Sequence, residues 1–297
     1  MSKFKTPLRY PGGKQRLSPF IVDILSENLI DGHYVEPYAG GAGVGIDLLL
    51  SKKIKHIHLN DTHLGIYAFW HSIINNNEKF CKEIYRTSIT VDEWKKRKEI
   101  VKRLDTSNLF ELGFSTFYLN RCNRSGILTA GLIGGYSQQG KYKMDARFNR
   151  IDLIRRIETI GLFANQISIS KLDAEYYIKN YISNLPNNTL IYLDPPYYKK
   201  ASDLYVNSYK NSDHLKLSKV IQNEIKHKWI LSYDGVEEIL NLYTKRRHFL
   251  YDLQYSADKV YKGKEVFVFS DNIKLPESCS LDHVNSGLEN LVIGQNE

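Results

Sequence analysis

The sequence predicts an α/β protein whose core is a mostly parallel β-sheet. Short apolar strands alternate with helices in the first third of the chain, and the same alternation resumes after residue 160. Between these parts, residues 76–160 are charged, aromatic and glycine-rich in turn. We therefore expect one α/β core of residues 1–75 and 161–270, an inserted, mainly helical domain of residues 76–160, and a tail of residues 271–297.

A helix and a strand–helix–strand unit are expected within the first 61 residues. Ser18 is placed to cap the helix, which is predicted to run to about Asn28. A glycine-rich loop then joins a strand to a second helix, and an acid follows the next strand, as in one βαβ unit of a parallel sheet. In order, these features are the apolar helix face Ile21, Ile24 and Leu25, the strand His33–Tyr38, the loop Gly40-Gly41-Ala42-Gly43, the helix Val44–Leu50, the strand Ile54–Leu59 and the pair Asn60-Asp61.

The inserted segment has a different character. Val91–Leu104 is typical of a charged amphipathic helix, and Phe110–Leu119 is aromatic. Arg121–Met144 shows no apolar periodicity, which predicts an exposed functional loop. Residues 76–165 hold 17 Lys and Arg against 10 Asp and Glu, so they carry most of the net charge of +8. This balance favours a polyanionic partner such as nucleic acid, although a solvated basic face is the alternative.

The second part of the core reads as strands and helices again. Thr189–Leu193 is apolar throughout, as expected for a strand buried on both faces. The other predicted elements are the strand Gln166–Ser170, the helix Ala174–Asn184, the strand Trp229–Tyr233, and a closing antiparallel pair, His248–Tyr255 and Glu265–Ser270, joined through Lys262-Gly263-Lys264.

Composition excludes several classes of protein. With 42% apolar residues and no apolar run of the roughly 18–20 residues that span a bilayer, we expect no membrane partner and a cytoplasmic location. The three cysteines lack CxxC spacing and the nine histidines form no HExxH motif, so neither a disulfide framework nor a metal site is expected.

Two loops are expected at the carboxyl edge of the sheet, where open parallel sheets bind ligands. The first is Glu36–Gly45, whose glycines let the backbone pass close to a cofactor. It lacks the Gly-Lys-Ser/Thr of a Walker A loop, and its GxGxG spacing fits the NAD fingerprint poorly. The glycines alone leave NAD and S-adenosylmethionine equally open. Asp61 suits a ribose in either cofactor, with a helix N-cap as the alternative.

The second loop is Asp194-Pro195-Pro196-Tyr197, directly after the buried strand. Consecutive prolines stiffen the backbone and fix the Asp194 carboxylate and a neighbouring carbonyl as acceptors aimed at one point. Two acceptors that grip the N–H bonds of an aryl amine steer its lone pair toward an electrophilic methyl group and stabilise the developing positive charge. Tyr197 suits stacking on a base that has left the double helix. The segment therefore predicts methylation of an exocyclic base amine.

The chain resembles the Dam-like DNA adenine methyltransferases over nearly all of its length to about residue 270. The resemblance is carried by Leu8-Arg9-Tyr10-Pro11-Gly12-Gly13-Lys14, Val35–Gly43, Asn60-Asp61 and Asp194-Pro195-Pro196-Tyr197. Their order is that of the alpha group of amino methyltransferases. The resemblance implies a Rossmann-like methyltransferase core with an inserted target-recognition domain, and direct transfer of the methyl group of S-adenosylmethionine to adenine N6 in duplex DNA.

The resemblance also implies site residues. Tyr10 and Lys14 would line the cofactor pocket, Asp61 would hold the ribose, and Asp173 would lie at the cofactor adenine. The methionine part, beside Asp194, would be held by Glu36, Pro37, Tyr38, Gly40, Gly41 and Gly43. Asn120–Gly126 is similar to the opening of the family's recognition hairpin, but the stretch typical of GATC-reading members is absent. The candidate DNA contacts are Arg121, Asn123, Arg124, Gln138, Gln139, Lys141 and Lys143.

Other functions compete with this one. Carbon-5 cytosine methylation needs a Pro-Cys nucleophile, which the sequence lacks. Cytosine N4 methylation uses a related Ser-Pro-Pro-Tyr segment, so Asp194 favours adenine. An RNA base-amine methyltransferase and a catalytically idle protein that binds S-adenosylmethionine or nucleic acid stay open. We expect a monomer, with a dimer as the alternative, and a restriction or defence partner is compatible with the family. The target sequence is not predicted.

Overall fold

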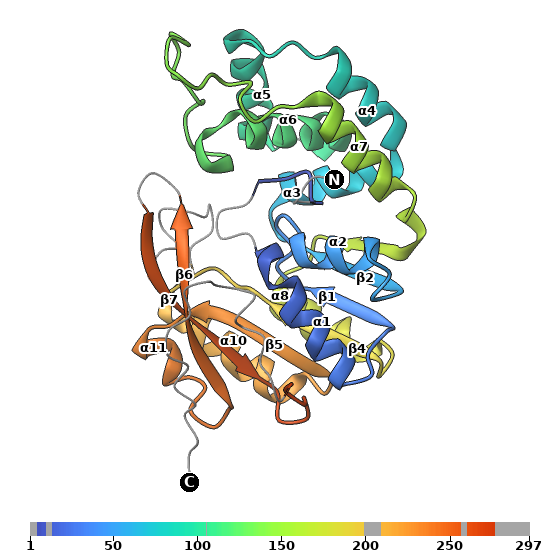
Figure 1. The fold of residues 1–297 in the computed structure, drawn as a ribbon, viewed down its shortest axis with the longest axis vertical. Coiled ribbons are helices and arrows are strands. Elements are labelled where there is room, and N and C mark those ends of the chain that lie inside the picture. The colour runs from blue at the N-terminus through green and yellow to red at the C-terminus, as the bar shows by residue number, and fades with distance from the viewer. Residues whose placement is uncertain (1–4, 10–13, 105, 199–208, 257–259, 277–297) are drawn as a thin grey trace.

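The computed structural model describes residues 5–9, 14–104, 106–198, 209–256 and 260–276. Within these ranges one sheet of seven strands has the order β3-β2-β1-β4-β5-β7-β6 (Figure 1). Strands β1 to β5 run parallel, whereas β7 is antiparallel to β5 and β6 is antiparallel to β7. The strands are β1 His33–Glu36, β2 His56–Asn60, β3 Ile167–Ser170, β4 Thr189–Leu193, β5 Lys228–Asp234, β6 His248–Ser256 and β7 Val260–Phe269. The predicted α/β class and mostly parallel sheet are confirmed.

Helices cover both faces of this sheet. Because successive strand residues point to opposite faces, Tyr34 and Val35 of β1 belong to different hydrophobic clusters. The Tyr34 cluster is completed by α1 (Ser18–Glu27) and α2 (Gly43–Leu50), and the Val35 cluster by α8 (Ala174–Asn180) and α10 (Asn211–Glu224). A further short helix that flanks the sheet is α11 (Glu237–Leu240).

A second group of helices lies beyond the sheet, at the upper end in Figure 1. Helix α6 (Leu109–Cys122) is buried on all sides and crosses α3 (Leu64–Asn75) closely. The contact depends on Gly113, because a Cβ atom there would overlap the backbone carbonyl of Ala68. The other members are α4 Asn77–Arg86, α5 Val91–Arg103 and α7 Arg150–Gly161. The hydrophobic cluster on the α1 face of the sheet continues through α3 into this group. The proposed domain boundaries stay a prediction.

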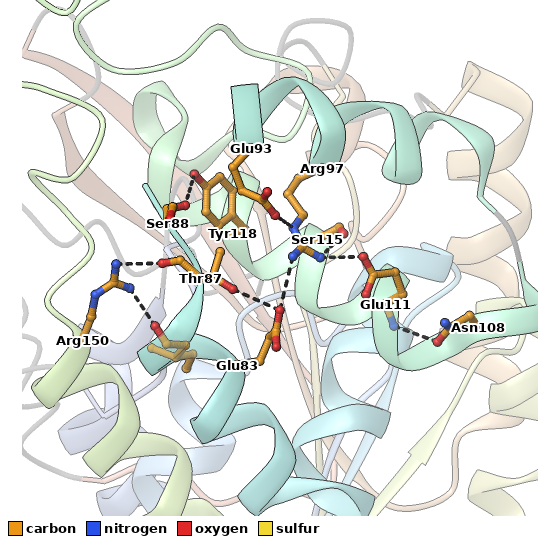
Figure 2. A network of polar contacts seen from close by, with 11 residues as sticks. Glu83, Thr87, Ser88, Glu93, Arg97, Asn108, Glu111, Ser115, Tyr118 and Arg150 are labelled. Atoms are coloured by element: carbon orange, nitrogen blue, oxygen red, sulfur yellow. Dashed lines mark hydrogen bonds and ion pairs between the residues drawn. The ribbon is translucent and has the colours of Figure 1, made fainter. Parts of the chain in front are cut away.

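A buried arginine joins three of these helices (Figure 2). Arg97 of α5 donates to the Glu93 carboxylate at 2.6 Å, to Glu111 of α6 at 2.7 Å and to Glu83 of α4 at 3.3 Å. The Arg97 side chain is 4% exposed, so its charge is removed from water and balanced by carboxylates alone. This cluster fixes the relative positions of α4, α5 and α6.

Two predicted local features are wrong. Ser18 does not cap α1, because a 3₁₀ turn at Lys14–Leu17 runs directly into the helix and makes Ser18 its first residue. Lys262-Gly263-Lys264 does not join the closing strands, because these residues pair with β6 inside β7. The tail is described only to residue 276, where Ile273 is buried and the Lys274 N–H donates to the Asn28 side chain.

Three histidines stack on adjacent strands β1 and β2. The ring nitrogens of His33 and His58 lie 2.8 Å apart, and the His56 and His58 centroids are 4.6 Å apart. The Ser168 hydroxyl contacts His56, and the Tyr181 hydroxyl contacts His58. Burial lowers the pKa of all three histidines, and for His58, where the His56 and His33 imidazoles add to the effect, it falls to about 3.

This stack predicts acid sensitivity of the fold. The unfolded chain binds protons at these histidines near their ordinary pKa of about 6.5, whereas folded His58 stays neutral down to about 3. The free energy of unfolding should therefore fall as pH drops from about 6.5 toward 3, with full stability above that window. Urea unfolding at several pH values measures the slope, and His58→Gln should flatten it. An identical slope in wild type and His58→Gln would contradict the prediction.

Candidate active site

The carboxyl ends of β1 and β4 meet at the point where the strand order reverses. Strands β2 and β3 continue on one side of β1, whereas β4 and β5 continue on the other. Open α/β sheets bind ligands in the crevice outside the carboxyl ends of the strands at such a switch point. The loop after Glu36 and the segment Asp194–Tyr197 both begin here, as the sequence predicted.

The glycine loop between β1 and α2 is held from several directions. Gly40 and Ala42 have φ of 45° and 44°, and the Gly40 N–H donates to Asp61 Oδ2 at 2.8 Å. Thr6 Oγ1 donates to the Gly41 carbonyl at 2.5 Å, and Trp70 Nε1 donates to the Gly40 carbonyl at 3.0 Å. The loop is therefore preorganised, with its backbone path fixed by flanking side chains.

Asp61 directly follows β2 and accepts hydrogen bonds from the backbone of two loops. Its Oδ1 accepts the His63 N–H at 2.8 Å, while Oδ2 accepts the Gly40 N–H. The alternative of a helix N-cap is wrong, because the cap of α3 is His63, whose ring accepts the Ile66 N–H. Burial raises the pKa of Asp61 despite these hydrogen bonds.

The buried amide of Asn60 ties three strand ends together. Its Nδ2 donates to the carbonyls of Pro37 and Leu172 at 3.0 Å each, and its Oδ1 accepts from the Leu172 N–H and Ser170 Oγ. Asp173 follows this junction, is exposed, and caps α8 by accepting the Tyr176 N–H at 3.0 Å. The edges of β1, β2 and β3 therefore present Pro37, Asp61 and Asp173 along one side of the crevice.

Glu36 is a carboxyl group buried at the end of β1. Its Oε1 accepts the Gly45 N–H at 2.9 Å, and no cationic side chain pairs with it among the described residues. Burial raises its pKa to about 8, and Asp194 adds to the rise. A Cβ atom at Gly45 would lie 3.3 Å from this oxygen, so the lack of a side chain at Gly45 leaves room for the Glu36 carboxyl group. A cationic ligand would offset the cost of this burial.

Asp194 projects from the end of β4 and is fixed by the neighbouring strand. Ser232 Oγ of β5 donates to Asp194 Oδ1 at 2.7 Å, and the Tyr192 and Ser232 hydroxyls are 2.8 Å apart. The Asp194 side chain is 25% exposed, and Lys14 Nζ lies 3.7 Å from Oδ1. Burial raises the pKa of Asp194 to about 6, with Lys14 opposing and Glu265 reinforcing this rise. Asp194 is therefore an ionised acceptor at neutral pH.

Lys14 and Tyr197 both donate hydrogen bonds to the buried carboxylate of Glu265, a residue that the sequence alone did not single out. Glu265 of β7 accepts from Lys14 Nζ at 2.7 and 2.9 Å and from Tyr197 Oη at 2.5 Å. Lys14 Nζ also donates to Tyr197 Oη at 2.6 Å, and Tyr251 Oη donates to Glu265. A carboxylate at the start of the otherwise apolar stretch 265–269 was the available signal. Tyr197 is 2% exposed, so its ring offers no free face to a base in this arrangement, and the stacking role expected from the sequence stays a prediction.

The prediction of an exposed loop from Arg121 onward needs correction. Arg121 is the penultimate residue of α6, is buried, and donates to the Arg147 carbonyl at 2.7 Å. Asn123 is fully buried and accepts from Trp94 Nε1 at 2.7 Å. Burial lowers the pKa of Arg121 to about 9. Since their polar groups are used inside the helical region, we do not retain Arg121 and Asn123 as DNA contacts.

The other candidate DNA contacts lie at or near the surface. Gln138 is partly buried and holds its own loop, because its amide donates to the Ile133 carbonyl and accepts the Met144 N–H. Arg124, Gln139, Lys141 and Lys143 are exposed, and the same loop carries the exposed aromatic residues Tyr136 and Tyr142. Basic and aromatic side chains on one exposed loop suit a nucleic-acid partner. Tyr10 lies outside the described residues.

Two further observations concern the described residues alone. No group of three or more His, Cys, Asp or Glu side chains within the described ranges has an arrangement that could hold a metal ion. None of the helices in that part of the chain combines the length and apolar character needed to cross a lipid bilayer.

The chain is similar in sequence to known methyltransferases. The family model for D12 class N6 adenine-specific DNA methyltransferases matches residues 10–257. Type II methyltransferase M.CviBI of Paramecium bursaria Chlorella virus NC1A is 23% identical over 232 residues, covering 78% of this chain and 84% of that protein. Modification methylase StsI of Streptococcus sanguinis is 26% identical over 202 residues, covering 65% of this chain and 28% of that protein.

Among solved structures, the rRNA methyltransferase aviRa of Streptomyces viridochromogenes matches with a TM-score of 0.38 and 11% identity, covering 88% of this chain and 86% of that one. The family match therefore covers most of the chain, including all strands from β1 to β6. The chain belongs to the family of D12 class N6 adenine-specific DNA methyltransferases.

Proposed function

We propose that this chain transfers the methyl group of S-adenosylmethionine to the N6 amine of an adenine turned out of duplex DNA. The observation that carries the proposal is the position of Asp194. Its carboxylate stands at the carboxyl end of β4, held by Ser232, across the switch point from the glycine loop of β1. Asp194 is also the first residue of the segment that suits gripping a base amine.

The residues of the crevice fit S-adenosylmethionine as methyl donor. When bound, it supplies a positively charged sulfonium with an electrophilic methyl group. Glu36 is a buried carboxyl group that no described cation neutralises, so it suits the charged methionine part. Gly40 and Gly41 keep the loop backbone open to it, while Asp61 and Asp173 stand at the ends of β2 and β3 for the nucleoside part.

Asp194 and a neighbouring backbone carbonyl accept the two N–H bonds of the adenine amine. These acceptors would direct the nitrogen lone pair at the methyl carbon of a bound donor, so that the N–C bond would form as the C–S bond breaks and the sulfonium would become a neutral thioether. The methylated nitrogen would then release its extra proton to water. A carboxylate with a pKa of about 6 is ionised at neutral pH and stabilises the cationic nitrogen until that proton leaves.

A transfer assay with labelled S-adenosylmethionine tests the proposal. Duplex DNA of mixed sequence should take up label, and digestion to nucleosides should place it in N6-methyladenine. Label in N4-methylcytosine would identify the wrong base, and label in RNA alone would identify the wrong nucleic acid. Modification-sensitive sequencing of DNA from cells that express the chain then gives the target site. A role in DNA modification, as the names of the two relatives suggest, belongs to the same proposal.

The exposed loop after α6 is proposed to contact DNA, with Arg124 as its test residue. Arg124→Ala should weaken duplex binding several-fold or relax the sequence preference, because arginine pairs with phosphates and guanine edges. A phosphate contact predicts a salt dependence reduced by about one unit of slope, and a base contact predicts relaxed specificity. Lys53→Ala serves as control, since Lys53 is exposed just before β2, at the opposite edge of the sheet. Equal effects of both substitutions would refute the assignment.

A further inference from the structure

We propose that Glu265 is a positioning residue for methyl transfer, which anchors Lys14 and Tyr197 together beside the catalytic carboxylate. The inference rests on the proposed function and adds a residue from β7, far from the cofactor loop and the catalytic segment in sequence. Glu265 is fully buried, and both of its oxygens are engaged, by Lys14, Tyr197 and Tyr251.

The register of the sheet explains how Glu265 reaches this place. Strand β7 runs antiparallel to β5, with Glu265 opposite Asp234. The Tyr198 N–H donates to Asp234 Oδ1 at 2.9 Å, so β5 and β7 together hold the segment that follows Asp194. Lys14, in its 3₁₀ turn, lies against the end of β4 through its contacts with Tyr197 and Asp194. Three parts of the chain therefore depend on one carboxylate.

Burial of this cluster requires its charges to be matched. Burial alone would lower the pKa of Lys14, but Asp194 and Glu265 raise it above its ordinary value. Burial alone would raise the pKa of Glu265, but Lys14 lowers it below its ordinary value. Lys14 and Glu265 are therefore a charged pair, and Lys14 carries its charge within 3.7 Å of Asp194.

Removing Glu265 and removing Lys14 should shift the pKa of Asp194 in opposite directions. Glu265→Gln removes a negative charge and should lower the pKa of Asp194, whereas Lys14→Met removes a positive charge and should raise it. Among the described residues, the ionisable groups that interact electrostatically with Asp194, and that both variants leave in place, are Glu36, Tyr34, Tyr192, Tyr233 and Tyr251. If Glu265 only stabilised the fold and were not coupled to Asp194, the two variants would not shift the Asp194 pKa in opposite directions.

The test combines kinetics with titration of the folded chain. Glu265→Gln should lower kcat about 10- to 100-fold, because Tyr197 and the catalytic segment lose their anchor, with little change in KM for DNA. The acid limb of the kcat profile should move to lower pH in Glu265→Gln and to higher pH in Lys14→Met. Carboxyl ¹³C NMR of aspartate-labelled protein, with Asp194 assigned through Asp194→Asn, measures the same pKa shifts without substrate.

Two further variants separate positioning from folding. The double variant Lys14→Met, Glu265→Gln removes both members of the buried pair together and should unfold cooperatively while kcat stays low. Glu83→Gln makes the same chemical change beside the buried Arg97 and should leave kcat and the Asp194 titration as in wild type. Unchanged kcat and an unmoved Asp194 titration in both single variants would overturn the proposal. If the wild-type protein methylates no DNA, the proposed function fails. The NMR titration still tests Glu265 in that case: opposite shifts of the Asp194 pKa in the two single variants support the coupling of Glu265 and Lys14 to Asp194, and an unchanged Asp194 pKa in both refutes it.

Discussion

Replacing Asp194 with alanine is expected to lower methyl transfer by about 10²–10³-fold or more, the effect of removing one preorganised group that stabilises developing charge. The Asp194 carboxylate is the acceptor at the end of β4, and Ser232 and Lys14 already fix its position before any substrate arrives. Alanine removes the acceptor without replacing it. Glu265 still pairs with Lys14 in this variant, so no buried ammonium loses its only partner.

Single-turnover transfer and cofactor binding should be measured on the same Asp194→Ala preparation. We expect S-adenosylmethionine to bind with an affinity close to that of wild type, because Glu36, Asp61 and the glycine loop are untouched. Asp31→Ala is the matched control, since Asp31 is exposed before β1 at the opposite edge of the sheet. Full transfer activity in Asp194→Ala would remove this residue from the proposed mechanism.

Replacing Arg97 with methionine is expected to lower the free energy of unfolding by about 3 kcal/mol, the lower end of the range for breaking a buried ion pair. The Arg97 side chain is 4% exposed and holds three carboxylates from α4, α5 and α6 (Figure 2). Without the guanidinium, the three carboxylates repel one another across the same space. They are 20–35% exposed, so water relieves part of this cost and places the effect at the lower end.

Equilibrium denaturation with urea measures this change through the transition midpoint and slope. Arg155→Met provides the control, because Arg155 is 60% exposed and its pair with Asp152 lies at the surface. Exposed pairs of this kind contribute about 0–1 kcal/mol. A loss in Arg97→Met no larger than in Arg155→Met would show that the carboxylates find other partners once the arginine is gone.

The sequence predicted those features whose causes are local. Strand Thr189–Leu193 has the bounds expected from its apolar run, and the glycine loop and helix α2 follow β1 as the pattern of residues indicated. The segment Asp194–Tyr197 stands at the expected end of the sheet because connectivity alone determines that position in an open parallel sheet. Local signals failed where a neighbouring turn intervened, as when the 3₁₀ turn before Ser18 displaced the helix start.

Residues whose roles depend on distant partners could not be placed in this way. Arg121 and Asn123 have the composition of a surface loop, yet α6 carries them into the interior, where backbone carbonyls and Trp94 satisfy them. Glu265 and Ser232 gain their importance from strand pairing between β5 and β7 and from their proximity to Lys14 and Asp194. Register across a sheet is a tertiary property, and no spacing along the chain encodes it visibly.

The hydrophobic cluster that continues from the sheet through α3 into the helical region has a consequence for engineering. Helix α6 packs on α3 through the close contact at Gly113, so the sequences of these two helices must change together. A chimera that exchanges residues 76–160 for those of a relative would pair a foreign α6 with the resident α3. Exchanges of residues 76–160 should therefore include α3, with the upstream junction placed near Asp61 instead of at residue 76.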